Sequence, residues 1–195
     1  MEKKNEKLIT SRENCEKLVA ELNSRDIRTI EKARLCLLTV GEDAVPYLVS
    51  ALNDEDRNVR WEAAKTLAQM RNPALAPVLT RGLENKDPDI RWLSAEGLLA
   101  LGKDALFPLL SALVENPTSS SLIHGAHHVL QDFYLKRRHE GETSYYSLHE
   151  VGDDIRQKLK PVVQALEADE PSHSLPIAAK SALDFLKSES AGDKS

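Results

Sequence analysis

The chain contains 195 residues, of which 41% are hydrophobic and 29% charged, and its 26 Lys and Arg residues against 31 Asp and Glu residues give a net charge of −5. This length fits one domain or two small ones. Leu and Ala, which favour helices, supply most of the apolar share, and aromatic residues make up only 5%. The composition therefore disfavours a β-sandwich or barrel, and it excludes disorder throughout because there is enough apolar surface for a core.

The bulk properties predict a soluble, cytoplasmic protein that does not enter membranes. No uninterrupted apolar run approaches the ~18 residues of a membrane span, and the first residues lack the apolar stretch of a secretory signal. Cys15 and Cys36 are the only cysteines and lack metal-binding spacing, so reduced, packed thiols are favoured over a disulfide. The acidic balance makes general nucleic-acid binding unlikely, although it leaves room for a local basic stripe.

Three stretches of the chain resemble one another, and they begin at Thr29, Val59 and Ile90, at intervals of 30 and 31 residues. In each stretch a small residue comes four or five positions in, a leucine eight positions in and an apolar residue eleven positions in. Such offsets lie on one face of an α-helix. A short connector follows, and then a second apolar segment with a proline near its start, where a helix tolerates proline. The repeating unit is therefore predicted to be a pair of helices.

The pattern extends to five predicted helix pairs, at about 8–40, 43–70, 73–101, 104–138 and 151–187. The leucine that ends the first helix of each pair recurs at intervals of 30, 31, 30 and 53 residues, so one boundary carries extra residues. We assign these residues to an insertion at 134–154. The apolar pattern ends near 187, so we expect a single domain over 1–187 and a disordered tail at 188–195.

Acidic or amide residues come just before three of the predicted helices, in LNSRDIRTI, ALNDEDRNVR and GLENKDPDIR. Side-chain oxygens at such positions cap free N–H groups of a helix. Asp54 also lies six residues before Arg60, and Asn85 six residues before Arg91. Each pair could bond across its own turn or to the next repeat. We interpret these residues as structural rather than as ligand contacts.

The segments DEDRNVRWEAAKTLAQM and DPDIRWLSAEGLLALG closely resemble HEAT repeats, particularly the short subtype of phycobilin-lyase-related proteins with the pattern D-x-x-V-R-x-x-A-A-x-A-L-G. The resemblance is specific in the second and third pairs and good in the first, and only apolar positions match in the last two. It implies an all-α fold, a right-handed α-α superhelix of the HEAT-like α-solenoid type. Similar repeats occur in scaffolds, adaptors, lyase subunits and hydroxylases, so the resemblance does not fix one activity.

The exposed surface of the second helices is the best candidate binding site. The resemblance implies that these helices line the concave side of the array. The only two tryptophans hold equivalent positions there, each directly after an arginine, and this composition is typical of a binding hot spot. The alternative is that each tryptophan packs on the neighbouring helix and on the arginine stem. The candidate partner-binding residues on this surface are Arg60, Trp61, Lys65, Arg91, Trp92, Glu96, His124 and His128.

The histidines are the candidate metal ligands of this sequence. His124 and His128 lie one helical turn apart and could bind a metal, but no acidic or cysteine ligand accompanies them, so packed or solvated histidines are favoured. The dipeptides at 139–140 and 149–150 are His-Glu pairs. They invite comparison with deoxyhypusine hydroxylase, a HEAT-repeat enzyme whose iron ligands are His-Glu pairs. Here both pairs lie in the insertion instead of at repeat positions, which disfavours that interpretation.

The insertion also contains Tyr145 and Tyr146, which are further candidate contacts for a partner. A surface loop that is merely tolerated is the alternative for this segment. Altogether we expect a non-catalytic interaction or scaffold module for a protein or peptide partner, with no metal and no cofactor. One alternative is an enzyme-associated subunit, either a chromophore lyase or a histidine-metal oxygenase. The other is nucleic-acid binding through a basic stripe that includes Arg57 and the KRR stretch.

Overall fold

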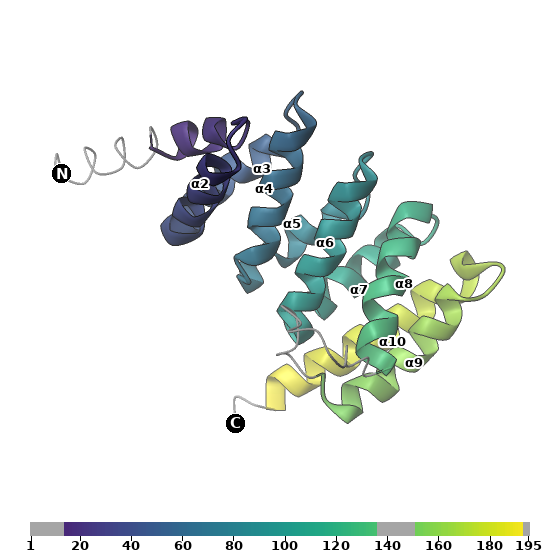
Figure 1. Cartoon of the computed structure of the whole chain (residues 1–195). Helices are drawn as coiled ribbons and strands as arrows, with labels where there is room; N and C mark the ends of the chain where they lie inside the picture. The colour runs from purple at the N-terminus through teal and green to yellow at the C-terminus, as the bar shows by residue number, and fades with distance from the viewer. Residues whose placement is uncertain (1–13, 136–150, 193–195) are drawn as a thin grey trace. The chain divides into compact units, whose positions relative to one another are not determined.

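The computed structural model describes residues 14–135 and 151–192, and all regular structure within these ranges is helical (Figure 1). Neighbouring helices pack on one another as in an α-solenoid, so the predicted all-α fold class is confirmed. The chain divides into two compact units, Met1–Met70 and Arg71–Ser195. This boundary falls between the predicted second and third helix pairs. The expectation of a single domain over 1–187 stays a prediction.

The first unit contains a helix at 14–21, α2 (Ile27–Val40), the 3-10 turn η1 (Gly41–Ala44), α3 (Val45–Ala51) and α4 (Arg57–Gln69). α4 packs on both α2 and α3. α2 and α4 are the second helices of the first two pairs, so they stack as the repeat pattern predicts. The core of this unit contains fully buried leucines from its helices and from the turn after the first helix, namely Leu22, Leu37, Leu48 and Leu67.

The second unit contains six α-helices and two 3-10 turns within the described ranges: η2 (Pro73–Leu75), α5 (Ala76–Gly82), α6 (Pro88–Leu101), η3 (Gly102–Ala105), α7 (Leu106–Glu115), α8 (Ser120–Leu135), α9 (Asp153–Leu166) and α10 (Pro171–Gly192). The first helices α5 and α7 pack on each other, and so do the second helices α6 and α8. The third and fourth pairs therefore follow the predicted repeat.

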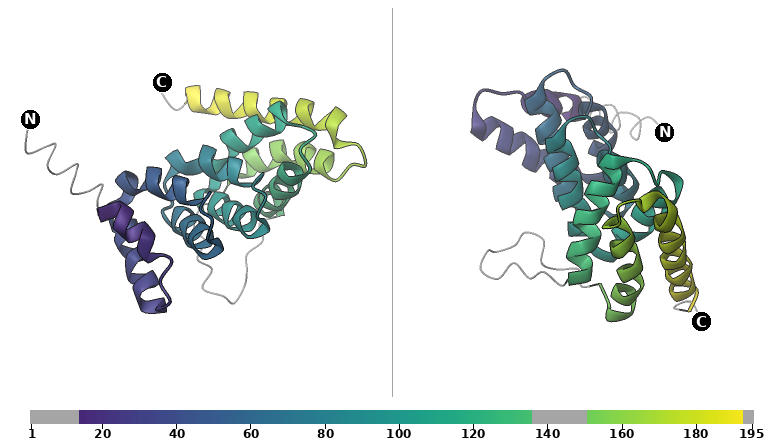
Figure 2. Two further views of the ribbon diagram at one scale, coloured as in Figure 1. Left: turned by 90° about the horizontal axis from the view of Figure 1, so that it is seen from above. Right: turned by 90° about the vertical axis from the view of Figure 1, so that its right-hand side faces the viewer.

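The fifth pair departs from that repeat. A regular continuation would pack α9 on α7 and α10 on α8. Instead α9 packs on α8, and α10 packs on α7 (Figures 1 and 2). The stretch 136–152 separates α8 from α9. A connection of that length does not restrict α9 to the position next to α7, where the first helix of a regular pair would pack. α9 therefore extends the layer of α6 and α8.

Aspartates begin the second helices of the first three pairs, as predicted. The side chains of Asp26, Asp56 and Asp87 accept hydrogen bonds from the backbone N–H two residues further on, at 3.2, 2.7 and 3.0 Å. These bonds satisfy N–H groups that have no partner inside the helix. α2 and α6 end at Gly41 and Gly102, whose φ angles of 71° and 59° glycine adopts readily.

α10 continues to Gly192, five residues beyond the predicted end of the last helix. The expectation of a disordered tail from 188 therefore does not hold for 188–192, and 193–195 lie outside the described residues. The segment contains Ser, Glu and Ala but no proline, and no glycine before Gly192, so nothing in it breaks a helix. Apolar periodicity identifies the buried part of a helix, and a helix can continue past the last apolar position of its pattern.

One described segment, Pro88–Glu115, is apolar and long enough to cross a membrane by length and composition alone. It is not a single straight helix, because α6 ends before Gly102 and α7 begins at Leu106. More than half of its most apolar window, 56%, is buried inside the protein. Packing in the core therefore accounts for its apolar character, and the segment is weak evidence for a membrane span.

Candidate binding surface

Arg60 and Arg91 hold together the turns that precede α4 and α6. Nη1 of Arg60 donates to the backbone carbonyls of Asp54 and Glu55, both at 2.9 Å. Nη1 of Arg91 donates to the two equivalent carbonyls of its own turn, at 2.8 and 3.2 Å. Of the two arrangements that the sequence left open, bonding across the own turn is the observed one. These guanidinium contacts serve the fold.

In the first unit, Trp61 is half-buried and lies beneath a cation of its own helix. Nζ of Lys65 is 4.4 Å from the centroid of the Trp61 ring. Burial lowers the pKa of Lys65, and the nearby Arg34 guanidinium lowers this pKa further, whereas the carboxylates of Glu62 and Glu31 oppose the shift. The candidates Trp61 and Lys65 are thus brought together, and each is a partner of the other.

A largely buried ion pair lies beside this contact, between α2 and α4. Nη1 of Arg34 is 2.7 Å from Oε2 of Glu62, and the two side chains are 14% and 11% exposed. Nothing in the sequence pattern predicts this pair. The two residues are 28 positions apart, and Glu62 follows Trp61 without any local motif that points to Arg34.

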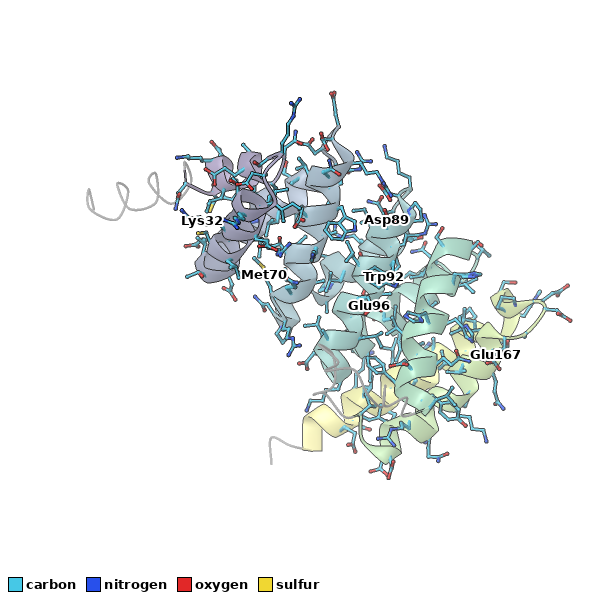
Figure 3. All side chains as sticks on the ribbon, in the orientation of Figure 1. Lys32, Met70, Asp89, Trp92, Glu96 and Glu167 are labelled. Atoms are coloured by element: carbon cyan, nitrogen blue, oxygen red, sulfur yellow. The ribbon has the colours of Figure 1, made fainter. Side chains whose placement is uncertain are left out.

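In the second unit, Trp92 is the most exposed of the candidate aromatic residues within the described ranges, at 55%. Glu96 lies one turn further along the same side of α6 (Figure 3). Its Oε1 is 3.5 Å from Nε2 of His128 on α8, and the two side chains are 12% and 52% exposed. His124 is exposed one turn before His128. Trp92, Glu96, His124 and His128 together form what we call the α6–α8 face.

The histidines of α8 face different neighbours. His128 contacts Glu96 of α6, whereas Nε2 of His127 lies 3.4 Å from Oε1 of Glu167, which follows α9. In the part of the chain that the structure describes, no group of three or more His, Cys, Asp or Glu side chains is placed to hold a metal ion. The His-Glu pairs at 139–140 and 149–150 lie outside the described residues.

Other candidates from the sequence are placed as follows. Tyr145 and Tyr146 lie outside the described residues, as does the KRR stretch at 136–138. Cys15 is buried and Cys36 half-buried, and neither forms a disulfide in the part of the chain that the structure describes.

Most of these helices lie in the part of the chain that matches a known family. A family model described as HEAT repeats matches the chain over residues 15–98 and again over 45–131, which together make up more than half of its length. No curated protein matches the chain.

Proposed function

Because the chain belongs to the HEAT-repeat family, whose members generally mediate protein interactions, we propose that it is a non-catalytic scaffold that binds a protein or peptide partner. The α6–α8 face is the proposed binding surface. It combines an exposed aromatic ring, a carboxylate and two imidazoles on two adjacent helices of one compact unit.

The exposure of Trp92 is the observation that carries this proposal. A tryptophan that is 55% exposed leaves a large apolar ring in water. Covering roughly 100 Å² of it contributes about 2.5 kcal/mol to binding, at ~25 cal/mol per Å². Tryptophan is also among the residues most enriched in the binding hot spots of protein interfaces. A partner that covers Trp92 therefore gains substantially from this one side chain.

The equivalent surface of the first unit is a weaker candidate. The Trp61 ring already has Lys65 over it, and the turn arginine Arg60 is bonded to backbone carbonyls. A partner would have to displace the Lys65 ammonium before it could reach the Trp61 ring. We therefore place the main contact on Trp92 and not on Trp61.

Affinity capture with matched variants tests the proposal. The wild type, Trp92→Ala and Phe107→Ala are used to recover proteins from an extract of the native host, with quantitative mass spectrometry as the readout. Phe107 is a suitable control because it is 49% exposed on α7, in the other helix layer of the same unit. A partner that Phe107→Ala recovers normally and Trp92→Ala loses supports the site. Equal recovery by all three proteins refutes it.

The finer assignments belong to the same proposal. We place the protein in the cytoplasm. We assign its repeats to the short, phycobilin-lyase-type subtype on the basis of the 30- and 31-residue intervals and the D-x-x-V-R-type motifs. An absorbance spectrum and a metal analysis of the purified protein test the alternative of an enzyme-associated subunit. Salt-dependent retention on a phosphate resin tests the nucleic-acid alternative.

A further inference from the structure

The two tryptophans hold equivalent repeat positions but are followed by opposite charges. One turn after Trp61, at i+4, the chain has Lys65, and the Lys65 ammonium lies over the indole at 4.4 Å from its centroid. A cation over the face of a tryptophan is attracted by the negative potential of the ring. Trp61 therefore has a cation supplied by its own helix.

Trp92 has a carboxylate where Trp61 has an ammonium. Glu96 is the residue at i+4, and it lies on the same side of α6 as Trp92 (Figure 3). Among the described residues of the second unit, the cations that lie over aromatic rings lie over Phe185 and Phe107, and none lies over Trp92. Trp92 is exposed, whereas Trp61 is half-buried. The second unit thus presents the ring without a cation and adds an anion next to it.

Packing against α8 holds the Glu96 carboxylate in place. Its side chain is only 12% exposed, and Oε1 is 3.5 Å from Nε2 of His128. A carboxylate has about four acceptor positions, so a long contact to one imidazole leaves capacity for a further donor. A carboxylate that is fixed beside an aromatic ring matches the chemistry of a side chain with a cation at the end of an apolar stem.

We propose that the α6–α8 face binds a lysine or arginine side chain of the partner, with its cation over the Trp92 ring and paired with the Glu96 carboxylate. This inference rests on the proposed function and adds the chemistry of the partner. The partner supplies in trans the contact that Lys65 makes with Trp61 inside the first unit. The net charge of −5 also favours a basic partner segment.

The two tryptophans provide the readout, because they give two separate indole N–H signals in an NMR spectrum of ¹⁵N-labelled protein. The probes are three capped peptides in which glycine alternates with lysine, with arginine or with the uncharged norleucine. We expect the lysine and arginine peptides to shift the Trp92 signal at millimolar concentrations and to leave the Trp61 signal in place. The shift should weaken as salt is added. The norleucine peptide should have little effect.

Two variants of Glu96 test the role of its charge. Glu96→Gln keeps the shape of the side chain and should weaken binding of the lysine peptide about fivefold, which corresponds to a loss of ~1 kcal/mol. Glu96→Lys recreates the Trp61–Lys65 arrangement and should abolish binding. Thermal melting of each variant checks that it is folded.

The inference is overturned if the norleucine peptide shifts Trp92 as strongly as the lysine peptide, if no peptide shifts it, or if Glu96→Gln binds as tightly as the wild type. Failure of this inference is distinguishable from failure of the proposed function. Suppose that a partner is lost with Trp92→Ala but recovered normally with Glu96→Gln and Glu96→Lys. In that case the α6–α8 face is still the binding surface, and only the proposed preference of this face for cations is refuted.

Discussion

Single side chains close the turns between helices, and the turn before α6 shows how. The Asn85 side chain accepts a bond from the N–H of Asp87 at 2.9 Å, and the Asp87 side chain accepts one from the N–H of Asp89 at 3.0 Å. Arg91 then donates to the carbonyls of the same turn. Backbone groups that a turn leaves without helix partners are thereby satisfied.

Loss of the Arg91 guanidinium should therefore destabilise the fold. We expect Arg91→Ala to lower the free energy of unfolding by about 1–2 kcal/mol, because two charge-assisted hydrogen bonds disappear. Urea denaturation measures the change. The control is Arg81→Ala, since Arg81 is exposed on α5, and this change should stay within about 0.5 kcal/mol. Equal losses in the two variants would contradict the assigned role of Arg91.

The lowered pKa of Lys65 is a second consequence at this scale. Because desolvation and the Arg34 charge both lower it, the Lys65 amine should lose its proton at lower pH than the ordinary value of 10.5. Arg34→Met should raise this pKa, and Glu62→Gln should lower it further. NMR titration of the Lys65 side chain measures both changes, and a shift in the same direction for the two variants would exclude this electrostatic account.

The lowered pKa of Lys65 also determines how its contribution to stability changes with pH. The unfolded chain binds the Lys65 proton more tightly than the folded chain does. The contribution of Lys65 to stability therefore increases as the pH rises from the folded pKa to the unfolded value near 10.5.

At the scale of helices, close approach of α8 to the end of α5 depends on a residue without a side chain. A Cβ atom added at Gly125 would lie 2.8 Å from Cδ2 of Leu83 and 3.2 Å from its Cβ. Leu83 is fully buried and has little room to move. Glycine at this position therefore costs some helix propensity but permits the packing of the fourth pair.

Gly125→Ala should destabilise the protein by about 1 kcal/mol, because overpacking of 1–3 kcal/mol outweighs the gain of roughly 1 kcal/mol in helix propensity. Leu83→Ala removes the 2.8 Å contact with Cδ2 and leaves only the contact with Cβ at 3.2 Å, so in that background the same change should be clearly less destabilising. Thermal or urea unfolding of the four proteins measures both effects. Stabilisation by Gly125→Ala in the wild-type background would show that the contact with Leu83 is not restrictive.

The fifth pair shows where prediction of helix packing stops. The leucine interval of 53 residues correctly indicated extra residues between α8 and α9. It could not indicate that α9 packs on α8, because an apolar stripe shows that a helix is buried but not which helix covers it. The regular pairs were predictable since short connectors leave few alternatives.

At the scale of the whole molecule, the repeat period predicted the helix pairs, the acidic residues before the helices predicted the caps, and the resemblance of two segments to HEAT repeats indicated the family. The pairing of Glu96 with His128 and of His127 with Glu167 was not predicted. These contacts join residues 32 and 40 positions apart, and they depend on the rotation of each helix about its axis. The sequence shows that Lys65 follows Trp61 and that Glu96 follows Trp92 at the same spacing. The contact between the Lys65 ammonium and the Trp61 ring, which only the structure shows, is what links this charge difference to binding at the ring.

Recovery of a host protein by Trp92→Ala relative to Phe107→Ala shows whether the α6–α8 face binds the partner. Both changes remove an exposed aromatic ring from the second unit, but only Trp92 belongs to the α6–α8 face. We predict at least a tenfold loss of the partner with Trp92→Ala, which corresponds to roughly 1.4 kcal/mol or more, and normal recovery with Phe107→Ala. Recovery of the partner by Trp92→Ala at the level of the wild type would contradict the claim that this face binds it.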